Sequence, residues 1–204
     1  MMQLNKKSEF IFEPNWYRGI EYQKEQELGY DYKEDLYVPG YFEFNIKKGE
    51  SVVFSAGLSE LKTSQMKKIF DHEYDVHVPR TNFQSCLVNA AHQFHYERDG
   101  ETYIIAGYPW FKCRARDMFV SLPGLTLAID EVEYFEKAMK TAEKAINDFI
   151  AGAESSIKMY EMDKPDVLLG AIWCIQQYAR LISADAAFEK YGKLVAKILN
   201  FIKE

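Results

Sequence analysis

The hydrophobic pattern of this 204-residue chain changes its period near residue 59, and this change limits the fold more than any other feature. Up to that point, short aromatic and β-branched runs predict strands. They lie at 8–14, 40–46 and 51–57, and the turn at 47–50 would join the last two as a hairpin. Beyond it, apolar residues at helical spacing predict helices at 117–129, 131–152, 164–183 and 185–203. Because three or four strands cannot close a sandwich, we expect an α+β chain that is mainly α.

Turn and capping residues organise the segments around these elements. Residues 27–40 are rich in loop-forming residues and predict a loop. Thr81 or Asn82 is the expected N-cap of a further helix. Asp99-Gly100 stands between two β-rich runs, which is a strong signal for a tight hairpin.

The charge balance favours a neutral partner. The formal net charge is −6 and the pI is near 5.4, whereas binding to nucleic acid or to an anionic membrane calls for a basic face. No run reaches the roughly 18 apolar residues of a membrane span, and the first residues lack an apolar signal core. We therefore expect a cytoplasmic protein that binds neither nucleic acid nor membrane.

The cysteines and histidines give little support for a cofactor or a metal. Cys86, Cys113 and Cys174 are an odd, widely spaced set, which argues against disulfides and against a cysteine zinc site. The cations that flank Cys113 would lower its thiol pKa, but no His or Asp pattern supports a thiol nucleophile. His92 and His95 have helical spacing, and structural roles are favoured over a metal pair. No cofactor and no metal are expected.

Residues 106–125 carry the most informative combination of side chains. Tyr108 and Trp110 offer flat faces for a sugar ring, and Arg116-Asp117 follow shortly after them. A carboxylate accepts hydrogen bonds from adjacent hydroxyls, and a guanidinium donates to their oxygens. The alternatives are that Asp117 only caps a helix and that the aromatic residues belong to a partly buried turn.

Other carboxylates are less distinctive. Asp166 stands at a helix start, where N-capping is its simplest role, with Pro165 at the first turn. Glycoside hydrolysis needs two carboxyl groups that face each other across the scissile bond. Among 31 acidic residues, no such pair stands out.

The same stretch resembles the sugar-binding signature of bacterial and archaeal glycogen debranching enzymes, the amylo-α-1,6-glucosidase family. The similarity includes Arg116-Asp117 and extends in order over nearly the whole chain. The segments that carry it are 17–44, 106–111, 121–125 and 166–178. Residues 17–44 resemble the end of the family's N-terminal sandwich domain. Residues 166–178 resemble a helix of the family that ends in Gln-Gln-Tyr.

The resemblance implies an incomplete α/α toroid of helical hairpins, preceded by a few antiparallel strands from the end of a β-sandwich. It assigns residues 1–58 to the sandwich-like region, 59–80 to a helix and linker, and 81–204 to the first part of the toroid glucosidase domain. An open toroid face would leave apolar surface exposed, so self-association through that face is expected.

The family reaction is hydrolysis of α-1,6-glucosidic branch points in glycogen-like α-glucans by an inverting two-carboxylate mechanism. Carried over by position, Arg116 and Asp117 would bind the outer hydroxyls of the non-reducing glucose. The implied substrate-binding residues are Arg116, Asp117, Trp110, Tyr108 and Asp166. The general acid and base are expected beyond Glu204, so no catalytic residue is assigned and the 204-residue chain alone is expected to be inactive.

The chain departs from the family pattern at three positions expected to face the sugar. Arg114-Ala115 replace Trp-Gly, Met162-Asp163 replace Tyr-Asn, and Gly170 replaces an aromatic residue. These changes leave a second hypothesis open, in which the chain is a non-catalytic, degenerate glucan-binding or interaction module.

Overall fold

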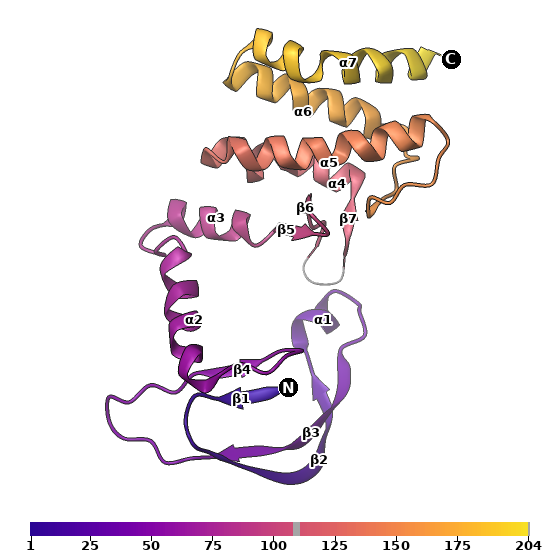
Figure 1. Ribbon diagram of the computed structural model, residues 1–204. Helices are drawn as coiled ribbons and strands as arrows, with labels where there is room; N and C mark the ends of the chain where they lie inside the picture. Colours follow the sequence, from indigo (N-terminus) through magenta and orange to yellow (C-terminus); the bar gives the residue numbers. More distant parts are fainter. Residues whose placement is uncertain (108–110, 204) are drawn as a thin grey trace. The chain divides into compact units, whose positions relative to one another are not determined.

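The computed structural model describes residues 1–107 and 111–203 and divides into two compact units, Met1–His77 and Val78–Glu204 (Figure 1). The described residues form small two-stranded sheets and seven α-helices, so the expected mixture of helix and strand is confirmed. The toroid, and the predicted division of the chain into residues 1–58, 59–80 and 81–204, stay predictions. Within those described ranges, no helix is long and apolar enough to cross a membrane.

The first unit is built from four strands and two helices. The strands are β1 (Met2–Leu4), β2 (Glu9–Glu21), β3 (Lys33–Glu43) and β4 (Phe54–Ala56). The helices are α1 (Gln23–Glu27) and α2 (Thr63–Val76). Strand β2 pairs antiparallel with β3, and β1 pairs antiparallel with β4.

The predicted hairpin over residues 40–57 is wrong, because β3 and β4 pair with strands that precede them in the chain. The predicted loop over 27–40 is also wrong in its second half, where β3 begins at Lys33. Pro39 was a loop signal, yet each strand of a two-stranded ribbon has an unpaired edge at which proline breaks no ladder hydrogen bond. Local sequence signals therefore misplaced a strand whose partner residues lie 12 (Glu21↔Lys33) to 34 (Glu9↔Glu43) positions earlier in the chain.

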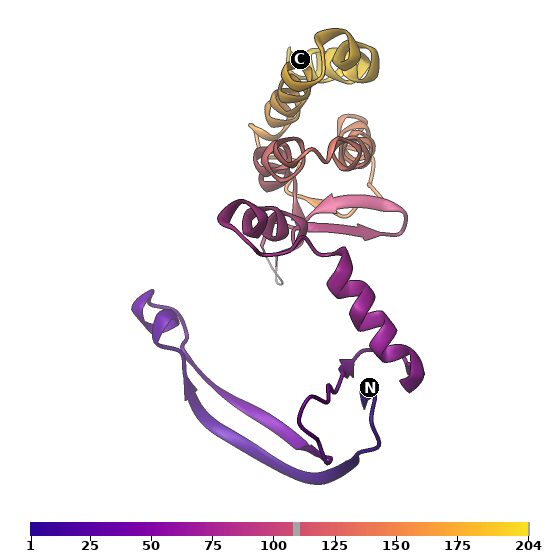
Figure 2. The same cartoon turned by 90° about the vertical axis from the view of Figure 1, so that its left-hand side faces the viewer.

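The second unit contains most of the helices. Its helices are α3 (Phe83–His92), α4 (Ala115–Leu125), α5 (Val132–Ile150), α6 (Val167–Leu181) and α7 (Ala184–Lys203), with a short 3-10 turn at Leu127–Ile129. Its strands are β5 (His95–Arg98), β6 (Glu101–Ile104), β7 (Cys113–Arg114) and β8 (Met159–Tyr160). The four predicted helices are confirmed to within a few residues at each end. Figure 2 views α4 to α7 nearly end-on.

Two local predictions in this unit are confirmed. Asn82 accepts a hydrogen bond from the Ser85 amide, and the Ser85 side chain accepts one from the Asn82 amide, which is a capping box. Asp99 and Gly100 have φ of 55° and 77°, as a two-residue turn between antiparallel β5 and β6 requires.

Helices α4 to α7 share one apolar core with strand β6. Phe119 and Leu122 of α4, together with Phe135 of α5, are fully buried. The Phe135 ring stacks on Tyr178 of α6 with 5.4 Å between centroids, and Tyr178 in turn meets Tyr191 of α7 edge-on. Burying each large side chain contributes about 1.5–3 kcal/mol, so this core accounts for much of the unit's stability.

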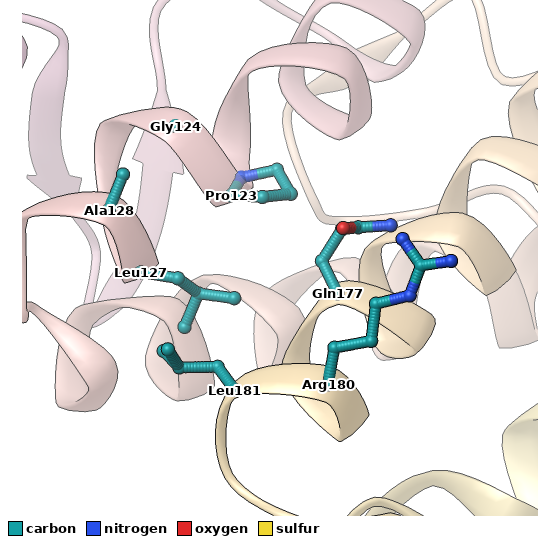
Figure 3. A pocket seen from close by; sticks show the side chains of 7 residues that line it. All are labelled: Pro123, Gly124, Leu127, Ala128, Gln177, Arg180 and Leu181. Atoms are coloured by element: carbon teal, nitrogen blue, oxygen red, sulfur yellow. The ribbon is translucent and has the colours of Figure 1, made fainter.

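Apolar side chains remain exposed along α4 and α6. Val120, Leu169 and Trp173 each expose more than two fifths of their surface. A shallow, largely apolar pocket lies between the C-terminal ends of the two helices (Figure 3). It is lined by Pro123, Gly124, Leu127, Ala128, Gln177, Arg180 and Leu181. Self-association through this face stays a prediction.

A polar contact joins three of these helices and gives a testable pH dependence. Glu136 of α5 accepts a hydrogen bond of 2.6 Å from the Tyr178 hydroxyl and forms an ion pair with Lys190 of α7. Lys190, and then Tyr178, hold the pKa of the Glu136 carboxyl below its ordinary value of 4.5. A lowered carboxyl pKa adds stability that is present above the ordinary pKa and is lost as the pH falls through the lowered one.

We therefore expect the wild-type protein to be more stable than Glu136→Gln near neutral pH, and this difference to shrink on acidification. Urea denaturation of both proteins at a series of pH values from neutral downward through the ordinary carboxyl pKa measures it. A difference in unfolding free energy that stays constant over the range would contradict the role given to the Glu136 charge.

Candidate functional site

The first turn of α4 presents Arg116 and Asp117 to solvent. Strand β7 runs directly into this helix, and the N-cap position is Arg114. Asp117 is therefore inside the helix, and the alternative that it serves as the cap is wrong. A carboxylate in the first turn is still favourable, since it faces the positive end of the helix dipole.

Arg116 is held by a carboxylate from a different helix. Its Nη2 atom donates to Asp166 Oδ1 at 2.6 Å, and the two side chains are 49% and 53% exposed. The contact raises the pKa of the Arg116 guanidinium and lowers the pKa of the Asp166 carboxyl, so both groups stay charged. Asp166 occupies the N-cap position of α6 but makes no side-chain cap there. The N-capping role predicted for Asp166 is thus replaced by an ion pair that orients Arg116.

The close approach of α4 and α6 brings these two charges together. Gly170 of α6 lies against Phe119 of α4, and a Cβ atom on Gly170 would stand 3.3 Å from the Phe119 Cβ. The Cys174 thiol donates to the Phe119 carbonyl oxygen at 2.8 Å. Gly170 was expected to face the sugar, but the structure places it in this helix contact.

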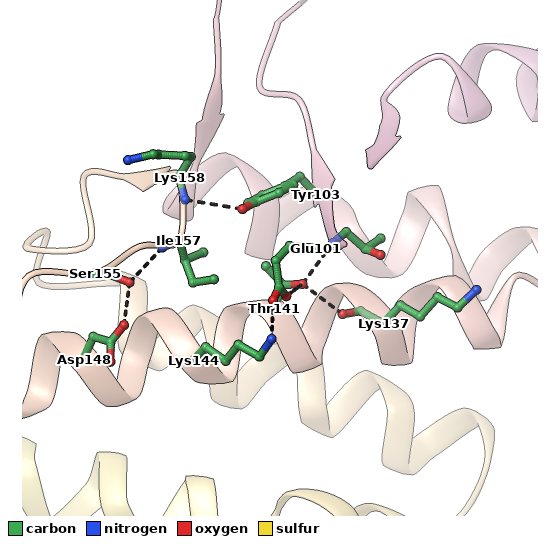
Figure 4. Close-up of polar contacts among 10 residues, drawn as sticks. Glu101, Tyr103, Lys137, Thr141, Lys144, Asp148, Ser155, Ile157 and Lys158 are labelled. Carbon is green, nitrogen blue, oxygen red and sulfur yellow. Dashed lines mark hydrogen bonds and ion pairs between the residues drawn. The ribbon is translucent and has the colours of Figure 1, made fainter. Parts of the chain in front are cut away.

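The connection between α5 and α6 carries a second set of side chains to the site (Figure 4). Asp148 accepts a hydrogen bond from Ser155 at 2.6 Å, and the Ile157 amide donates to the Ser155 hydroxyl at 3.2 Å. The Lys158 amide donates to the Tyr103 hydroxyl at 3.4 Å. These contacts fix the path of the chain up to β8, which pairs in parallel with β7.

Figure 4 also shows polar contacts that anchor the β5–β6 hairpin to α5. Glu101 accepts a hydrogen bond from the Thr141 hydroxyl at 2.9 Å and forms an ion pair with Lys144. Thr141 also accepts from the Thr102 amide at 3.0 Å. These contacts therefore hold the β5–β6 sheet, which precedes the site in the chain, against the helical core.

Two pairs of charged and aromatic side chains lie where β7 and β8 pair, just before α4 begins. The Arg114 guanidinium lies over the Phe111 ring at 4.9 Å, with its Nε 3.6 Å from Glu161 Oε1. Lys112 Nζ lies 5.0 Å from the centre of the Tyr160 ring. Two-residue pairing between β7 and β8 brings these side chains together, and it is too short to leave a recognisable sequence pattern. Glu161 and Tyr160 are therefore residues of this region that sequence reasoning missed, whereas Phe111 belongs to the signature at 106–111.

The loop that contains the other predicted site residues is only partly described. The Phe111 amide donates to the Gly107 carbonyl oxygen at 2.9 Å, which closes the two ends of the loop. A Cβ atom on Gly107 would meet the Phe111 ring at 2.5 Å, so only glycine allows this ring position. Tyr108 and Trp110 lie outside the described residues, and their sugar contacts stay predictions.

The Cys113 thiol is not activated by its charged neighbours. Cys113 is fully buried, and burial raises its thiol pKa to about 12. Its Sγ contacts Met118 Sδ at 3.7 Å. The expectation that the flanking cations lower this pKa is therefore wrong, because Lys112 and Arg114 project away from the interior that encloses the thiol.

His95 has a structural role. Its Nε2 lies 2.8 Å from the Leu125 carbonyl oxygen, and its ring stacks on Tyr134 with 3.9 Å between centroids. In the part of the chain that the structure describes, no group of three or more His, Cys, Asp or Glu side chains could hold a metal ion.

Comparison with known families decides the ancestry of this site. A family model described as Amylo-alpha-1,6-glucosidase matches residues 82–203, which is more than half of the chain. The chain belongs to this family. A second model, described as Glycogen debranching enzyme N terminal, matches residues 1–53. No curated protein and no solved structure matches the chain.

The predicted relationship to glycogen debranching enzymes is thus confirmed. Every residue of the candidate site lies within the segment that matches the amylo-alpha-1,6-glucosidase model. The structure brings Arg116 and Asp166 into direct contact, with Asp117 next to Arg116 on the same helical turn. Three of the five predicted site residues therefore lie together on one exposed edge of the unit.

Proposed function

We propose that this chain binds the non-reducing end of an α-glucan and takes part in the hydrolysis of α-1,6 branch points in glycogen-like glucans. Arg116 and Asp117 contact the hydroxyls of the terminal glucose, and Asp166 holds Arg116 in position. No side chain of this chain is assigned the role of catalytic acid or base.

The ion pair between Arg116 and Asp166 is the observation that carries this proposal. An arginine fixed by one carboxylate keeps further N–H groups for ligand oxygens, since a guanidinium has five. Asp117 adds acceptors on the adjacent residue. A donor and an acceptor side by side match the adjacent hydroxyls of a glucose ring, whose oxygens both donate and accept.

Exposure of the site also supports binding to a chain end. Arg116 and Asp166 are about half exposed, so a glucan can reach them without a large rearrangement. Preorganised groups lose little conformational entropy when they bind, because the ion pair already restrains the arginine.

Two measurements test the proposal. Calorimetric titration of this chain with maltotriose should show saturable binding, and a longer protein that carries this chain together with the acid and base carboxylates should release glucose from a branched limit dextrin. Binding without glucose release by that longer protein would assign the chain to the alternative, a non-catalytic glucan-binding module. The absence of maltotriose binding would contradict the proposal, whatever the result with dextrin.

A further inference from the structure

Lys112 and Arg114 project from the same side of an extended segment. Cys113 lies between them and is fully buried. Side chains alternate between the two sides of a strand, so the neighbours of a buried residue point outward. The two cations, Arg114 in β7 and Lys112 just before it, therefore stand on the outer side of this segment, with Cα atoms about 7 Å apart.

Each cation is held over an aromatic ring. The Arg114 guanidinium lies 4.9 Å from the centre of the Phe111 ring, and Lys112 Nζ lies 5.0 Å from that of Tyr160. The ring of Phe111 also lies against Gly107. Attraction between a cation and the face of a ring restrains both side chains before any ligand arrives.

The polar atoms of these cations are less engaged than those of Arg116. Arg114 Nε is 3.6 Å from Glu161, which is an ion pair but is longer than a hydrogen bond. Lys112 Nζ donates to the Tyr160 hydroxyl at 3.5 Å, which is long for a hydrogen bond. Arg116, by contrast, donates to Asp166 at 2.6 Å. Lys112 and Arg114 thus combine restrained positions with donors that a stronger acceptor could take.

We propose that Lys112 and Arg114 form an oxyanion clip beside the glucose site, and that the preferred ligand is an α-glucan whose terminal glucose carries a phosphate ester or a carboxylate. The planar guanidinium supplies two parallel N–H donors, and the lysine adds a point charge. Arg116 and Asp117 remain the contacts for the hydroxyls, so this inference rests on the proposed function. Glu161 is the carboxylate with which the ligand oxyanion competes for Arg114.

Calorimetry with three saccharides tests the clip. The probes are maltotriose, maltotriose with a phosphate ester on C6 of its non-reducing glucose, and maltotriose oxidised at that carbon to a carboxylate. We expect the two anionic saccharides to bind the wild-type protein about 5- to 10-fold more tightly than maltotriose, as one charge-assisted contact allows. This preference should fall as salt is added, because the groups are exposed.

Substitutions at the clip should remove the preference. Arg114→Gln should equalise the three affinities, since the glutamine keeps polar contacts but no charge. Arg114→Lys should retain part of the preference, because it keeps the charge and loses the planar fork. Arg98→Gln, which removes another exposed arginine of the same unit, should leave the preference intact.

Three results would overturn the clip. The first is equal affinity of the wild-type protein for the three saccharides. If maltotriose binding still depends on Asp117, this result refutes the clip and leaves the proposed function standing. The second is a preference that survives Arg114→Gln. The third is inorganic phosphate that binds as tightly as the phosphorylated saccharide. The anion would then bind without any contribution from the sugar site. A wild-type protein that binds none of the saccharides would refute the proposed function as well.

Discussion

Replacing Asp117 with alanine should weaken maltotriose binding by about 100-fold, the loss expected when two charge-assisted hydrogen bonds of about 1.5 kcal/mol each are removed. Asp117 lies on the exposed first turn of α4 beside Arg116, where its carboxylate can accept from two adjacent hydroxyls. Calorimetric titration of the wild-type and Asp117→Ala proteins measures the change in dissociation constant.

The matched control is Asp185→Ala. Asp185 is also an exposed acidic residue in the first turn of a long helix, α7, so both substitutions remove a similar interaction with a helix dipole. We expect the two variants to lose comparable stability in thermal unfolding, while only Asp117→Ala loses affinity. Equal affinity in wild-type and Asp117→Ala would remove Asp117 from the site.

Replacing Phe119 with alanine should lower the free energy of unfolding by about 3–5 kcal/mol, as large-to-small substitutions of buried aromatic residues do. Phe119 is fully buried, and its Cβ faces Gly170 in the contact between α4 and α6. The cavity cannot close easily, because Gly170 has no side chain with which to fill it. Urea denaturation of the two proteins measures the loss.

Val120→Ala is the control for this substitution. Val120 is the next residue of α4 and is 67% exposed, so its truncation should change stability by less than about 0.5 kcal/mol. Glucan binding by Phe119→Ala should also weaken, because the ion pair between Arg116 and Asp166 depends on the contact between α4 and α6. A loss of stability no larger than that of Val120→Ala would contradict the placement of Phe119 in the core.

Helices were predicted well because their signals are local. The repeat of apolar residues in α5 and α7 reports one buried face, and Asn82 with Ser85 reports a helix start within four residues. The signal for the hairpin at Asp99-Gly100 is also local, since its turn needs only two residues with positive φ. Each of these signals acts over a few residues, so the tertiary context had little opportunity to override it.

Strand partners were predicted poorly because pairing is not local. The segment from Tyr37 to Tyr41 contains Pro39-Gly40 and looked like a loop, yet it pairs with residues around Trp16. The short strand β4 pairs with β1, which precedes it by about fifty residues. Neither choice of partner can be inferred from the turn at 47–50, since a turn between two strands does not require that they pair with each other.

By itself, the sequence determined the family, the positions of the long helices and the presence of Arg116 and Asp117 at the start of α4, because each depends on short-range pattern or motif. Only the tertiary structure decided that Asp166 holds Arg116 across fifty residues, that Arg114 pairs with Glu161, and that Cys113 is buried with a raised thiol pKa. The physical reason is that ion pairs between helices and burial of a thiol depend on which elements come into contact. Which elements come into contact depends on the packing of the whole core, so no single segment of sequence determines it.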